Sequence, residues 1–92
     1  MIQPASYTLE VTDVSGQRRH KARGVPADST IGEFIDGLVP RLNLTTTSPA
    51  GDVVTYHALL QREGRHLHRS EIVRETVRPN DLLVIEPEIK AG

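Results

Sequence analysis

The sequence contains no cysteine and no tryptophan, and its only aromatic residues are Tyr7, Phe34 and Tyr56. Without cysteine the chain cannot form disulfides, use a thiol nucleophile or hold a cysteine-ligated iron–sulfur cluster. With so few rings, its core must be mostly aliphatic. The longest uninterrupted apolar run, 82–85, is far shorter than the roughly 20 residues that a membrane-spanning helix needs.

The sequence also lacks an excess of positive or negative charge, because it contains eleven Lys and Arg residues and twelve Asp and Glu residues. Binding to phosphate backbones needs clustered basic residues, so nucleic acid is not an expected partner. Residues 1–4 lack the basic start and apolar stretch of a signal peptide. We therefore expect a cytoplasmic protein without a membrane partner. Ninety-two residues predict one small domain with little room for a deep catalytic pocket.

The N-terminal third predicts a β-hairpin. Strict apolar/polar alternation over 7–12 indicates a half-buried strand. Gly16 then supplies the positive φ that a tight turn often requires. The return strand, 18–25, is interrupted by charges and is two residues too long for a clean hairpin, so we expect a bulge or a longer turn.

The segment after the hairpin predicts a helix. Thr30 and Glu33 fit a capping box, in which each side chain bonds to the backbone of the other residue. Apolar residues then recur at helical period over 31–42. Pro40 lacks an N–H and disfavours helix at Val39, which predicts a kink or an end there.

The sequence after residue 42 predicts a loop at 43–52, a strand at 53–60 and a short extended segment at 66–68. A connector at 70–78 then leads to an apolar, central strand at 82–85. In the connector we expect Ile72 and Val77 to be the apolar anchors. A hairpin, a helix and a third strand suggest a right-handed crossover between parallel strands. The fold class is therefore α+β, with a mixed sheet of four to five strands packed on one helix. The predicted core consists of Leu9, Val11, Val25, Ile31, Phe34, Ile35, Leu38, Leu42, Leu60, Leu67, Val77, Leu83 and Ile85.

Taken in order, these segments resemble ubiquitin and its relatives over residues 7–92. The resemblance begins with the inward side chains of the first strand, which are Tyr7, Leu9 and Val11, and with the first turn at 14–16. It continues through the helix entry at 29–31 and through a glycine turn with its following leucine at 64–67. Three late apolar positions complete it, which are Val77, Leu83 and Ile85. It implies a ubiquitin-like β-grasp domain at 7–86, an N-terminal extension at 1–6 and an extended C-terminal tail at 87–92. The tail arm, from Glu86 to Lys90, is expected to lie outside the packed core.

The resemblance also implies a function at the C-terminus. Without a gap, residues 89–92 fall on the terminal leucine-arginine-glycine-glycine of ubiquitin, with Ala91 in place of the first glycine. Ubiquitin-like modifiers are adenylated at a terminal glycine by an activating enzyme, which acts with conjugating enzymes and deconjugating proteases. Gly92 and Ala91 are therefore the predicted conjugation residues of a prokaryotic modifier that is attached to a protein target.

Two alternatives stay open. One is a non-covalent adaptor, similar to the YukD-like accessory proteins of type VII secretion, which needs no terminal glycine. The other is a sulfur carrier, whose terminal glycine becomes a thiocarboxylate. Lys21 and Lys90 are the only lysines among eleven basic residues, so a modifier that is attached singly fits better than one that forms chains. We expect neither enzymatic activity nor a cofactor, because no spacing brings Ser, His and Asp together on one element.

Four apolar residues are the predicted protein-binding set. Leu59 and Val84 have the strand parity that points away from the core, Val14 lies at the first turn, and Ile89 lies in the tail. Ordinary solvent-facing positions are the alternative, because single exposed apolar residues are common.

Two groups of polar residues are also candidate sites. His66 and His68 share one side of an extended segment, but no third ligand stands near them in sequence, so no metal site is predicted. The basic run from Arg62 to Arg78 suits an acidic partner surface, although interleaved glutamates favour a solvated face.

Overall fold

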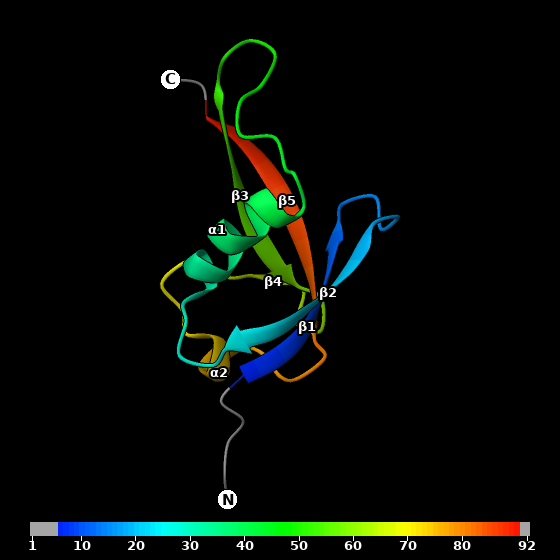
Figure 1. Ribbon diagram of the computed structural model, residues 1–92, viewed down its shortest axis with the longest axis vertical. Helices are drawn as coiled ribbons and strands as arrows, with labels where there is room; N and C mark the ends of the chain where they lie inside the picture. Colours follow the sequence, from blue (N-terminus) through cyan, green and yellow to red (C-terminus); the bar gives the residue numbers. More distant parts are fainter. Residues whose placement is uncertain (1–5, 91–92) are drawn as a thin grey trace, which may run out of the picture.

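The computed structural model describes the backbone of residues 6–90 and the side chains of residues 6–88 (Figure 1). Its elements, in chain order, are β1 (Ser6–Asp13), β2 (Arg19–Pro26), α1 (Ile31–Arg41), β3 (Val53–Leu60), β4 (Arg65–His66), α2 (Val73–Thr76) and β5 (Leu82–Lys90). Most of the predicted N-terminal extension, 1–6, and the whole of Ala91 and Gly92 lie outside the described residues.

The five strands form one mixed sheet in the order β2-β1-β5-β3-β4. β1 and β5 are parallel, whereas the other three neighbouring pairs are antiparallel. This confirms the α+β class and the central place of the last strand. The expected crossover between parallel strands is present, because β2 and β3, which α1 connects, both run opposite to β1 and β5 and so run in the same direction. These two strands are not neighbours in the sheet, because β1 and β5 lie between them.

The core lies between α1 and the inner face of the sheet. Almost every predicted core residue is buried there, and Leu42 is half-buried against the edge of the same cluster. Tyr7, expected to point inward from the first strand, is buried in the same cluster. Residues that the pattern did not nominate also belong to the core: Ala22, Ala27, Ala58 and Val73. Alanines are easily missed, because a small side chain gives little periodic signal even where it is fully covered.

The predicted bulge is present in β2. Tyr7 pairs with Val25 and Leu9 with Ala22, so Thr8 alone stands opposite Arg23 and Gly24. Gly24 has φ +70°, a backbone conformation that other residues rarely adopt. Gly16 has φ +74° in the turn before β2, as expected. The bulge restores the parity of β2, so Ala22 and Val25 both face the core despite Arg23 between them.

Helix α1 begins at the predicted cap. The Thr30 hydroxyl accepts the Glu33 N–H at 3.1 Å, and the Glu33 carboxylate accepts the Thr30 N–H at 3.0 Å. The helix extends past the predicted end at Val39, because Pro40 lies inside its last turn and Arg41 is the last helical residue. A proline there still ends the helix within two residues, since its missing N–H removes one bond of the ladder.

The connector before the last strand contains a short helix that was not predicted. α2 is a single turn, and its first residue, Val73, is completely buried, whereas Ile72 is only half-buried. Val77 is buried as expected. The turn is tied to the start of α1, because the Val73 N–H donates to the Ser29 carbonyl at 2.9 Å.

The C-terminal half of β5 differs from the expected free arm. Glu86 to Lys90 is extended, but it pairs in antiparallel register with residues 53–57 of β3, ending with Lys90 opposite Val53. The loop before β3 is fastened to β3 itself, since the Tyr56 hydroxyl donates to the Thr45 carbonyl at 2.7 Å. Figure 1 shows β3 and β5 running together beyond α1. Within the described residues, the sheet therefore extends four residues past the predicted boundary at Glu86.

No helix among residues 6–90 is long and apolar enough to cross a membrane.

Candidate docking face of the sheet

The face of the sheet opposite α1 carries a small apolar patch. Ala58 and Leu60 are completely buried on the inner face, so Leu59 between them points to the opposite face. On β5, Leu83 and Ile85 point inward in the same way, and Val84 points outward. Leu59 and Val84 are direct cross-strand partners, which places their Cβ atoms about 4.5–5.5 Å apart. The structure therefore brings these two predicted residues together.

Leu82 extends this patch, because it is two residues before Val84 on β5 and shares its parity. Leu59, Leu82 and Val84, all half-buried, are called the outer patch below. Sequence reasoning named Val84 as an outward residue of the run 82–85 but did not extend the same parity to Leu82. The alternation rule alone would have placed Leu82 beside Val84.

An ion pair fixes the start of β5 beside the outer patch. The Arg62 guanidinium donates two hydrogen bonds to the Asp81 carboxylate, at 3.1 and 3.0 Å. Although burial favours the neutral form of Asp81, the bonds from Arg62 and from the Arg78 N–H lower the pKa of this carboxyl below its ordinary value. The charge near the patch is thus locally balanced, and Asp81 is held in the geometry that begins the strand.

The other arginines between Arg62 and Arg78 also form ion pairs with acidic side chains. Arg65 bonds to Glu63 and Glu71 at 3.3 and 3.2 Å. Further along, Arg69 pairs with Asp36 of α1 at 2.7 Å, and Arg74 pairs with Asp28. These pairs support the interpretation of a solvated, internally paired face over that of a basic docking site.

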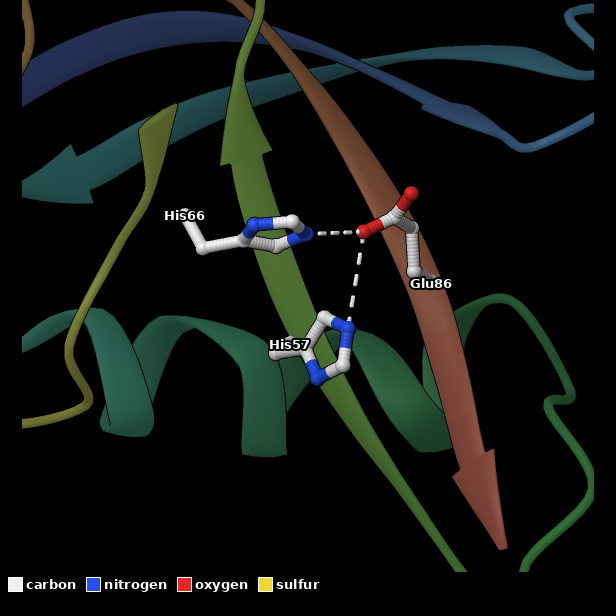
Figure 2. Close-up of side chains that lie close together, drawn as sticks. All are labelled: His57, His66 and Glu86. Atoms are coloured by element: carbon white, nitrogen blue, oxygen red, sulfur yellow. Dashed lines mark hydrogen bonds and ion pairs between the residues drawn. The ribbon is translucent and has the colours of Figure 1, made fainter. Parts of the chain in front are cut away.

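A polar cluster adjoins the outer patch on the same face. His57 of β3, His66 of β4 and Glu86 of β5 turn toward one another, and Figure 2 shows them on the side of the sheet away from α1. The His66 Nε2 lies 2.6 Å from the Glu86 Oε1, and the His57 Nε2 lies 3.4 Å from the same oxygen. His68, the expected companion of His66, is instead tied by its backbone N–H to Glu71 at 2.6 Å.

The remaining predicted site residues lie away from the outer patch or outside the residues that the structure describes. Val14 is 64% exposed in the β1–β2 turn, where it lines a hollow together with Leu42, Leu44 and Tyr56. The backbone of Ile89 pairs with Val54, but the side chain of Ile89 lies outside the described residues, as do Ala91 and Gly92. Their assignments therefore stay predictions.

Comparison with known proteins identifies the fold. No family model and no curated protein matches the sequence. Among solved structures, the chain is similar to the ubiquitin of Caldiarchaeum subterraneum, with 17% identity, a TM-score of 0.66, and coverage of 94% of this chain and 98% of that one. It is also similar to a chain from a structure concerning molecular mimicry of SUMO in DNA repair, with 13% identity, a TM-score of 0.69, and coverage of 91% and 94%.

A third likeness is to part of a much larger chain. A component of the ESX-5 inner membrane complex without MycP5 matches with 16% identity and a TM-score of 0.67, over 97% of this chain but 22% of that one. Identities this low show the fold alone. The chain therefore has the ubiquitin-like β-grasp fold, which confirms the resemblance drawn from its sequence. The fold alone does not decide what the chain does.

Proposed function

We propose that this domain is a non-enzymatic protein-recognition module that binds its partner non-covalently through the outer patch. The observation that carries the proposal is the extent of β5, which stays paired with β3 as far as Lys90. Leu59, Leu82 and Val84 supply an apolar surface on the face that α1 does not cover. Apolar side chains grouped on an uncovered face are typical of protein contacts.

The paired strand bears on the choice between docking and conjugation. A terminal glycine that is to be adenylated must reach into a narrow channel on an unpaired arm. Two residues beyond Lys90 give Gly92 a reach of about 7 Å from the sheet. A longer reach would require the ladder to open from its end at Val53 and Lys90. A docking role needs no such opening, and the sheet that presents the outer patch stays intact.

Activation at Gly92 as a protein modifier is the second candidate function. It is favoured by the likeness to the Caldiarchaeum subterraneum ubiquitin, which covers nearly the full length of both chains. In this role an activating enzyme would engage Ala91 and Gly92, with a conjugating enzyme and a deconjugating protease as further partners. The likeness to an ESX-5 chain instead supports an adaptor role like that of the YukD-like proteins. The sulfur-carrier hypothesis shares the need for Gly92.

The experiment compares three variants of an N-terminally tagged chain in its own host cell. Leu59→Asp places a charge in the outer patch, and deletion of Gly92 removes the reacting carboxylate. Val53→Asp is the matched control, because Val53 has the same parity on the same strand and is 59% exposed. Proteins recovered under native conditions are compared with those that stay attached after full denaturation.

We expect a partner that is recovered only under native conditions. Leu59→Asp should weaken its binding by about 1–3 kcal/mol, or roughly 5- to 150-fold, because a charge would be buried unpaired at the contact. The Gly92 deletion and Val53→Asp should retain it. Adducts that survive denaturation and vanish with Gly92 would instead establish the modifier function.

A further inference from the structure

Three strands bring one potential metal ligand each to a single point on the outer face (Figure 2). His57 and Glu86 are direct cross-strand partners on β3 and β5. His66 on β4 is the partner of Leu59, the next outward residue of β3 after His57. The backbone register, and not only the choice of rotamers, therefore makes the three side chains converge. One ligand atom of each residue lies within 4.8 Å of the other two.

The distances suit a small tetrahedral ion. Zinc–nitrogen bonds of 2.0–2.1 Å in a tetrahedron place neighbouring ligand atoms about 3.3–3.4 Å apart. The distance between the His57 Nε2 and the Glu86 Oε1 is 3.4 Å. The distance from the His66 Nε2 to the same oxygen is 2.6 Å, a direct hydrogen bond. An ion would replace this bond and move the two atoms apart by roughly 0.7 Å, a small displacement for an exposed imidazole. The imidazole rings meet edge to face at 89°, which keeps them from stacking across the site.

A second carboxylate supports the orientation of His57. The His57 Nδ1 lies 3.5 Å from the Glu88 Oε2, on the opposite side of the ring from Glu86. Histidine ligands in metal sites usually direct their second nitrogen to a carboxylate or carbonyl, which holds the proton there and leaves the other nitrogen free to bind the metal. Glu88 is placed to do this for His57. Glu88 is not one of the three ligands, and its contact with His57 is therefore a separate feature that also favours metal binding.

We propose that His57, His66 and Glu86 bind one divalent transition-metal ion, for which Zn²⁺ is the best match. Two imidazoles and a carboxylate are ligands that zinc accepts, whereas Mg²⁺ and Ca²⁺ favour sites built from oxygen. The three side chains are 35%, 61% and 28% exposed, so the fourth position faces solvent. The ion would join β4, which is two residues long, to β3 and β5.

This proposal adds a binding site that the docking function does not require. Sequence reasoning found no third ligand for His66 because it considered only its neighbours in the chain. His57 and Glu86 are separated from His66 by 9 and 20 positions, and only the pairing of β3 with β4 and β5 unites them.

The test is a titration of ZnCl₂ into metal-free protein without a polyhistidine tag, at neutral pH, followed by calorimetry. We expect one ion per chain. His57→Ala and His66→Ala should each weaken binding by at least 10- to 100-fold, the loss that is typical even for residues that only support a ligand. Glu88→Gln should weaken it within that range. His68→Ala and His20→Ala are the matched controls and should bind as the unaltered protein does.

A second measurement needs no variant and so does not depend on how a variant folds. In the unaltered protein, Zn²⁺ should shift the imidazole resonances of His57 and His66 and leave those of His20 and His68 in place. The thermal midpoint should rise with zinc concentration, because binding to the folded state alone stabilises it. Zinc binding that is equally weak in the unaltered protein and in a His57→Ala/His66→Ala variant would overturn the proposal. So would equal shifts of all four histidines.

Discussion

Replacing Phe34 by alanine removes the only phenylalanine of the domain from the first half of α1. Phe34 is 8% exposed and belongs to the cluster that joins the helix to the sheet. It also borders a hollow between β2 and α1, together with Val25 and Leu38. The cavity that the substitution leaves would therefore open toward solvent on one side.

The expected loss of stability follows from this position. Substitution of a buried phenylalanine by alanine costs about 3–5 kcal/mol, and the cost grows with the cavity that remains. Because water can enter from the side of the hollow, we expect the lower end, about 3 kcal/mol. For a domain of this size the thermal midpoint should fall by more than about 12 °C.

Urea unfolding followed by circular dichroism at 222 nm measures this loss, since the protein has no tryptophan to report on folding. The midpoint should fall while the slope of the transition stays the same. Gly37→Ala is the matched control on the same helix. A Cβ at exposed Gly37 meets nothing within 4 Å, so this change should stabilise the protein by up to about 1 kcal/mol. A loss below about 1 kcal/mol for Phe34→Ala would refute the packing described for α1.

Three further predictions concern the sheet and its charges. Leu59→Asp should leave the urea midpoint nearly unchanged, whereas Leu60→Asp should prevent folding or lower stability by several kcal/mol, because Leu60 is completely buried; the reverse order would show that the parity of β3 is wrong. Removal of residues 87–92 should lower the free energy of unfolding by about 1–3 kcal/mol, since β3 loses its partners from Val53 to Tyr56; a free tail would cost nothing. Bonds from the His68 N–H and from Arg65 lower the pKa of Glu71 below its ordinary value of 4.5. Burial of Asp81 acts to raise its pKa, but bonds from Arg62 and from the Arg78 N–H outweigh it and lower this pKa below the ordinary value of 3.8. Carboxyls with lowered pKa values stabilise the folded state fully above about pH 5, so the thermal midpoint should drop as the pH falls through 4, and Asp81→Asn should reduce this dependence.

Elements with local signals could be predicted from the sequence. The capping box at Thr30 and the apolar stripe of α1 depend on residues three and four apart, so neighbours in the chain determine them. The bulge in β2 could be anticipated from its length and charges. α2 could not, because a single turn has no periodicity and is held by the bond from Val73 to Ser29.

The end of β5 depended on a contact that the sequence does not reveal locally. Glu86, Pro87 and Glu88 lack the alternation of a covered strand, and proline is disfavoured in the middle of a sheet. In the structure, the pairing of β1 with β5 ends at Ile85, so Pro87 has a neighbouring strand on one side only. A missing N–H is tolerated at such an edge position. The histidine cluster was missed for the same reason, since strand register assembles it.

The most direct test of this account is the nuclear Overhauser pattern along the C-terminal half of β5. If β5 is paired with β3 as far as Lys90, backbone protons of Glu88 and Thr55 should show cross-strand contacts, and so should those of Ile89 and Val54. Chemical shifts typical of a strand should continue to Lys90. Absence of these contacts, with random-coil shifts from Pro87 onward, would contradict the paired arm and favour a free tail poised for activation at Gly92.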